Sequence, residues 1–89
     1  MDKKRLNIRY APDDNTLVRV TFKNNEELIG LAFSESYKGC GGIFLFSDRF
    51  KEEDIIKIEV GNLDEQSAKV KWIKKISSAA MEVGFNFLD

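Results

Sequence analysis

The sequence predicts an all-β protein: a six-stranded antiparallel β-barrel of the Greek-key or split-barrel type, preceded by a flexible basic N-terminal arm. Apolar and polar residues alternate with a period of two along most of the chain, as half-buried strands require, and strongly helical patterns are absent. The strands are short and are separated by turn-forming residues. This pattern favours a closed barrel, because closure leaves no exposed sheet edge.

The first half of the barrel should hold three strands. The first two are expected over residues 17–23 and 28–33, with a turn at residues 24–25 between them. Residues 37–42 contain three glycines in four positions and predict a loop or bulge. Residues 43–46 are apolar on both faces, which predicts a third strand that is covered on both sides.

The second half follows a polar link at residues 47–54. Alternation predicts its three strands over residues 56–60, 65–76 and 81–88. In the long strand, Ala68, Val70 and Trp72 are expected on one face, with lysines on the other. We expect one domain over residues 1–89, with the arm at residues 1–12 and the barrel at residues 13–89.

Composition restricts the cellular setting and the partners. The lone Cys40 cannot form an internal disulfide, the first residues lack the apolar run of a secretory signal, and no apolar stretch is long enough to cross a bilayer. A cytoplasmic protein without membrane insertion is therefore expected. The formal net charge of −1 gives no general attraction to polyanions, so neither DNA nor RNA is an expected partner.

An enzyme is the least favoured class. The chain has no His, which removes the usual general acid-base group and the commonest metal ligand, so no metal or cofactor is expected. Cys40 among glycines is a small apolar residue more often than a reactive thiol, and the acids at residues 52–54 form a solvated loop more often than a catalytic pair. The glycines at residues 39–42 match no nucleotide-binding loop pattern.

Two short motifs carry the functional prediction. Arg5-Leu6-Asn7-Ile8-Arg9 precedes the first strand, and Ser34-Glu35-Ser36-Tyr37-Lys38-Gly39 ends the second. In order and spacing they resemble the paired signature of PilZ domains, Arg-x-x-x-Arg followed by Asp/Asn-x-Ser-x-x-Gly. Val70-Lys71-Trp72 and Val83-Gly84-Phe85 are similar to late strands of the same family, so the resemblance covers nearly the whole chain.

The resemblance implies a PilZ-like barrel that binds the bacterial second messenger cyclic di-GMP and relays its level to an unidentified effector protein. Arg5 and Arg9 would grip guanine acceptors and phosphates, with Lys4 in the same basic arm, and ordering of the arm would be the signal. Ser36 would offer its hydroxyl, and Gly39 would allow a close approach of the ligand.

Trp72 has two interpretations at this stage, stacking beside a guanine or packing in the core. Ser34 stands where the family has Asp or Asn, and a hydroxyl is a shorter acceptor for the guanine edge. The expected loss in binding free energy is roughly 1 to 2 kcal/mol.

Two other classes stay open. One is a degenerate PilZ barrel that acts as a ligand-independent adaptor in pilus, flagellar or signalling assemblies, using Tyr37 and the apolar residues 43–46. The other is a small barrel that binds single-stranded nucleic acid, which the acidic balance disfavours. The plain interpretation of each motif is also available: terminal arginines can be solvated charges, and serines at a strand end can satisfy backbone groups.

Overall fold

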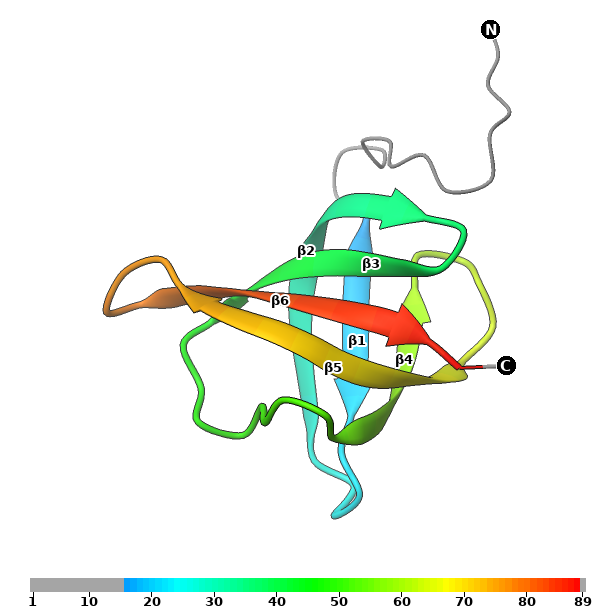
Figure 1. Ribbon diagram of the computed structural model, residues 1–89, viewed down its shortest axis with the longest axis horizontal. Helices are drawn as coiled ribbons and strands as arrows, with labels where there is room; N and C mark the ends of the chain where they lie inside the picture. Colours follow the sequence, from blue (N-terminus) through cyan, green and yellow to red (C-terminus); the bar gives the residue numbers. More distant parts are fainter. Residues whose placement is uncertain (1–15, 89) are drawn as a thin grey trace, which may run out of the picture.

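Six antiparallel strands close into a barrel in the computed structural model, which describes residues 16–88 (Figure 1). In chain order they are β1 (Leu17–Thr21), β2 (Glu27–Ser36), β3 (Gly39–Leu45), β4 (Ile55–Val60), β5 (Gln66–Lys75) and β6 (Ala80–Phe87). The spatial order is β1-β2-β3-β6-β5-β4, and β4 pairs back onto β1 to close the ring. The predicted six-stranded antiparallel barrel is confirmed. The predicted arm lies outside the described residues.

The barrel consists of two three-stranded meanders, β1-β2-β3 and β4-β5-β6, that meet at the β3–β6 and β1–β4 pairs. Residues 46–54 connect the two meanders. This link was expected to be polar, yet Phe50 within it is buried and packs between the rings of Phe22, Phe44 and Phe85, at centroid distances of 5.3, 4.9 and 5.9 Å. Phe50 therefore adds an aromatic contact to the core from outside any strand.

The core comes from the inward positions of the alternating strands. Val18 and Val20 of β1, Ile58 of β4 and Val83 and Phe85 of β6 are almost fully buried. The Phe44 ring of β3 packs against two glycines, Gly30 and Gly42. A Cβ on Gly42 would lie 2.9 Å from this ring, and a Cβ on Gly30 would collide with the ring and with the Ile43 carbonyl oxygen. The barrel is filled because large rings stand opposite positions without side chains.

Two predictions about β3 were wrong. Residues 37–42 do not form a loop: Gly39 to Gly42 belong to β3 and are buried, and only Tyr37 and Lys38 make the turn. In the sequence these glycines predict a loop. In the structure their missing side chains allow aromatic rings and the backbone of β6 to pack closely against β3. Residues 43–46 are not covered on both sides, because Phe44 is buried while Leu45 is 80% exposed.

Two bulges interrupt the regular register. On β2, Ala32 pairs with Gly42 and Ser34 with Gly41, so Phe33 is an extra residue. On β5, Val70 pairs with Phe85 and Trp72 with Gly84, so Lys71 is extra. The expectation that Trp72 shares a face with Ala68 and Val70 was therefore wrong. A bulge reverses the alternation that follows it, and Trp72 points outward.

Candidate ligand-binding surface

The two bulges place four residues, a serine, two glycines and a tryptophan, side by side on the outer face of the barrel. Ser34 of β2 pairs with Gly41 of β3, Gly41 pairs with Gly84 of β6, and Gly84 pairs with Trp72 of β5. We call this sequence across four strands the glycine row. Its centre has no side chains of its own, so the residues at its ends can cover it.

Aromatic rings lie over both glycines of the row. A Cβ on Gly41 would come within 2.6 Å of the Phe33 ring, and one on Gly84 would collide with the indole of Trp72. The two rings approach each other at a centroid distance of 6.3 Å. Each is 36% exposed, so one side of each ring rests on the sheet and part of the other meets solvent. The ring planes are tilted by 51° to each other, so the pair, which we call the aromatic platform, offers a planar ligand the face of one ring at a time.

Of the two environments expected for Trp72, the structure rules out the core. It is not part of the buried core, and it packs on the sheet from outside. Lys71 is exposed beside it, because the two residues of a bulge can present both side chains to one face. Alternation places Lys71 on the outer face, where the structure has it, but neither Lys71 nor Phe33 was predicted to belong to the site.

A second row runs next to the glycine row, toward the β2–β3 turn. It pairs Ser36 with Gly39, Gly39 with Asn86 and Asn86 with Lys69. The Ser36 hydroxyl donates to the Gly39 carbonyl oxygen at 3.3 Å, so one of its roles is to hold the turn. Gly39 is buried against the Phe85 carbonyl, which means that its missing side chain admits the backbone of β6.

A cleft of about 340 Å³ opens at the end of this second row. It is lined by Tyr37, Lys38, Gln66, Asn86 and Phe87, and we call it the Tyr37–Asn86 cleft. Backbone hydrogen bonds fix its walls: the Phe87 amide donates to the Lys38 carbonyl at 2.7 Å. An exposed phenol, an ammonium group and two amides thus surround one concavity. None of these residues was predicted to bind the ligand, although Tyr37 and Lys38 lie within the second motif and Tyr37 was named for the adaptor alternative.

The described chain begins close to this surface. The Ala32 amide donates to the Thr16 carbonyl at 2.9 Å, immediately before the Phe33 bulge. The predicted ligand-binding residues Lys4, Arg5 and Arg9 lie outside the described residues.

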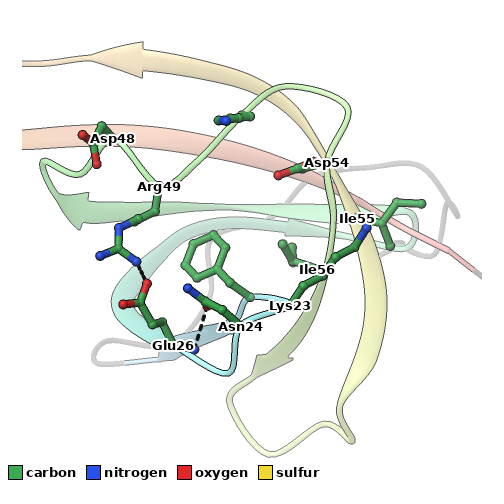
Figure 2. Close-up of a pocket in the computed structure, with 10 residues that line it drawn as sticks. Lys23, Asn24, Glu26, Asp48, Arg49, Asp54, Ile55 and Ile56 are labelled. Atoms are coloured by element: carbon green, nitrogen blue, oxygen red, sulfur yellow. Dashed lines mark hydrogen bonds and ion pairs between the residues drawn. The ribbon is translucent and has the colours of Figure 1, made fainter.

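A different cleft, of about 590 Å³, is lined by residues of the β1–β2 turn, the link at 46–54 and the start of β4 (Figure 2). Arg49 reaches across it to form an ion pair with Glu26. Asp48 and Asp54 also line it. Its three carboxylates are matched by three cationic side chains, Lys23, Arg49 and Lys51, and Arg49 is already paired with Glu26, so the cleft has no excess of positive charge that would favour an anionic ligand. Of the predicted site residues that the structure describes, none lines this cleft.

Comparison with known proteins places the fold. No protein-family model and no curated protein sequence matches the chain. Among solved structures, the PilZ domain of YcgR from Escherichia coli, a structure with c-di-GMP, is similar at a TM-score of 0.73 and 19% sequence identity; the match covers 98% of this chain and 79% of that one. The chain has a PilZ-like fold. On this PilZ-like barrel, the glycine row and the Tyr37–Asn86 cleft each include residues of the second sequence motif, which runs from the end of β2 to the start of β3.

Two further findings concern the described part of the PilZ-like chain. Residues 16–88 contain no cluster of three or more His, Cys, Asp or Glu side chains that could hold a metal ion. The same residues include no helix that could span a bilayer.

Proposed function

We propose that this PilZ-like barrel binds cyclic di-GMP on its outer surface and relays ligand binding to a partner protein. The observation that carries the proposal is the glycine row: two bulges set Ser34 of the second motif and the Phe33–Trp72 platform on one face, beside the Tyr37–Asn86 cleft. The similarity to a PilZ domain solved with c-di-GMP supports the same ligand class.

The bases of the ligand match the planar and polar parts of this surface. A guanine stacks on an aromatic ring with a gain of about 1 to 3 kcal/mol, and the exposed side of Trp72 offers such a ring. The Watson–Crick edge of guanine donates from N1 and N2. The side-chain amide oxygen of Asn86, in the neighbouring row, can accept these hydrogen bonds, whereas Ser34 has only a hydroxyl in place of a carboxylate or amide.

The phosphates match the cations around the same surface. Lys71 is exposed beside Trp72, and Lys38 lines the cleft. Lys69 is already paired with Glu53 at 3.4 Å and contributes less. Arg5 and Arg9 would complete the site from the N-terminal segment, because a guanidinium fork binds both guanine O6 and N7 and phosphate oxygens. The relay would consist of ordering this segment over the ligand.

Calorimetric titration with cyclic di-GMP tests the proposal. The wild type should bind at micromolar concentration or tighter, and Arg5→Ala and Arg9→Ala should each weaken binding at least tenfold. Arg19→Ala is the matched control, because Arg19 is exposed on β1 and pairs with Glu59 away from the two rows. Cyclic di-AMP is the ligand control, since adenine lacks O6 and the N1 proton.

Absence of heat and of NMR chemical-shift changes at millimolar cyclic di-GMP would overturn the proposal. The ligand-independent adaptor would then be the better assignment. Equal binding of cyclic di-AMP would show a general anion surface rather than a guanine site.

A further inference from the structure

Closure of the barrel covers only part of β5. The β4–β5 pairing involves residues 66–69, and the Val70 backbone then bonds to Glu53 and Asp54 at 2.7 and 2.9 Å. Beyond this point, residues 71–75 pair with β6 alone among the described residues. They belong to the β5–β6 hairpin, which projects past the ends of the other strands in Figure 1. The side of these residues that faces away from β6 is therefore an exposed sheet edge, which we call the open edge.

The pairing with β6 shows which backbone groups lie along the open edge. The Ile76 amide donates to the Ala80 carbonyl oxygen at 3.0 Å, so these two residues form a hydrogen-bonded pair. In an antiparallel ladder, hydrogen-bonded and non-hydrogen-bonded residue pairs alternate. Ile73 and Lys75 are in non-hydrogen-bonded positions, and their N–H and C=O groups point away from β6. An extended peptide can add to such an edge as a further strand.

The side chains of the open edge are basic. Lys71, Lys74 and Lys75 are all exposed. Within residues 16–88 none of the three forms an ion pair, although Glu82 lies opposite Lys74 on β6. The edge therefore has an excess of positive charge beside backbone groups that can pair with another strand.

This charge discriminates between the possible occupants of the edge. Two copies of the chain that paired through their open edges would bring lysines next to lysines, and like charges on neighbouring strands are destabilising. Natural sheets use lysines on exposed edges against such self-association. Acidic side chains on an added strand would instead form stabilising cross-strand pairs with the same lysines. The edge thus disfavours a second copy and favours an acidic strand.

We propose that the open edge of β5 binds an extended acidic segment of a partner protein as an added β-strand. The main chain of the partner exchanges hydrogen bonds with Ile73 and Lys75, and its carboxylates lie beside the edge lysines. For the relay, the inference rests on the proposed function: Trp72 lies within the same five residues, so a ligand stacked on its indole is next to the added strand. Binding of the acidic segment itself needs no ligand.

Calorimetric titration of the full chain with the synthetic peptide acetyl-Glu-Val-Glu-Val-Glu-Val-Glu-amide tests the edge without cyclic di-GMP. The wild type should bind it with a Kd at or below about 1 mM, and Lys74→Glu should weaken binding roughly tenfold. Lys57→Glu is the matched control, because it changes the charge equally on β4, where Lys57 has a strand neighbour on both sides. The same peptide with every amide N-methylated keeps its charges but cannot donate to the edge, and it should bind at least tenfold more weakly.

Amide hydrogen exchange adds a pattern that charge attraction alone does not produce. In the free protein the amides of Trp72 and Lys74, which face β6, should exchange more slowly than those of Ile73 and Lys75. Saturating peptide should slow exchange at Ile73 and Lys75 at least tenfold. Unchanged exchange at these two amides, or equal binding of the N-methylated peptide, would overturn strand addition.

The remaining outcomes separate this inference from the others. Equal losses in Lys57→Glu and Lys74→Glu, or equally tight binding of oligothymidylate, would show a general attraction to polyanions and overturn the edge site. Failure of the acidic peptide to bind, with normal binding of cyclic di-GMP, would overturn the edge and leave the proposed ligand site intact. Peptide binding at the edge without any binding of cyclic di-GMP would support the edge and overturn the proposed function.

Discussion

The clearest test of the binding surface is to remove the indole that covers Gly84. In Trp72→Ala the glycine row would lose its broadest planar group, while Ser34 and the cleft residues would stay in place. Stacking of one base on an aromatic ring is worth about 1 to 3 kcal/mol, so the affinity for cyclic di-GMP should fall about five- to 150-fold. Trp72→Phe keeps a smaller ring and should recover part of the loss.

The cost in stability can be separated from the loss of binding. Burial of the indole is incomplete, with 36% of the residue exposed, and its ring partner Phe33 lies at 6.3 Å. Truncation should therefore cost about 2 kcal/mol in the free energy of unfolding, below the 3 to 5 kcal/mol typical of a fully buried tryptophan. Urea denaturation without ligand gives this value. A folded Trp72→Ala protein at the temperature of titration makes the affinity change interpretable.

The assay uses a property of the chain itself, because Trp72 is its sole tryptophan. A guanine stacked on the indole should quench its fluorescence, and the quenching curve should give the same dissociation constant as calorimetry. Phe46→Ala is the matched control, since Phe46 is an exposed aromatic residue whose ring faces Lys75 at the other end of β3. Calorimetric binding without any change in fluorescence, and with wild-type affinity in Trp72→Ala, would refute the stacking platform.

Three more variants test separate parts of the argument. Ser34→Asp should strengthen cyclic di-GMP binding about ten- to thirtyfold in calorimetry, because a carboxylate is a charged acceptor for the guanine edge; unchanged affinity would separate Ser34 from that edge. Asn86→Ala should weaken binding about tenfold through one lost hydrogen bond, and equal affinity in the control Asn62→Ala and in Asn86→Ala would contradict this role. Phe50→Ala should lower the free energy of unfolding by about 3 to 5 kcal/mol in urea denaturation, whereas Phe46→Ala should cost under about 1 kcal/mol; similar losses would show that Phe50 does not anchor the core.

The barrel was predictable because its strands obey the rule of alternation. In β1, β4 and β6, the inward positions that the sequence indicates, such as Val18, Ile58 and Phe85, are the ones that the structure buries. Turn residues such as Asn25 take the positive φ that chain reversal requires. Local pattern and tertiary packing agree in these strands, so periodicity alone recovers them.

Prediction failed where glycine serves packing rather than turning. Gly39 to Gly42 look like a loop in the sequence, because nothing local shows that the Phe33 and Phe44 rings and the β6 backbone occupy the space of the missing side chains. The burial of Phe50 was not predicted for a related reason, because a single aromatic residue in a polar link is not part of any alternating pattern. Both features depend on partners distant in the sequence, which a scan of one segment does not contain.

Only part of the candidate site could be predicted from the sequence, because two β-bulges interrupt the alternation of the strands that carry it. The second motif gave Ser34, Ser36 and Gly39 by order and spacing, but Trp72 was assigned to the wrong face and Lys71 was missed. Each bulge adds one residue to its strand, and each reverses the side on which later residues appear. On β5 the reversal brings Trp72 to the outer face, where its indole lies over Gly84 beside the Phe33 ring. The two positions that depart from the pattern of the core meet across four strands at the surface where we propose that cyclic di-GMP binds, as expected where function and stability make different demands on a sequence.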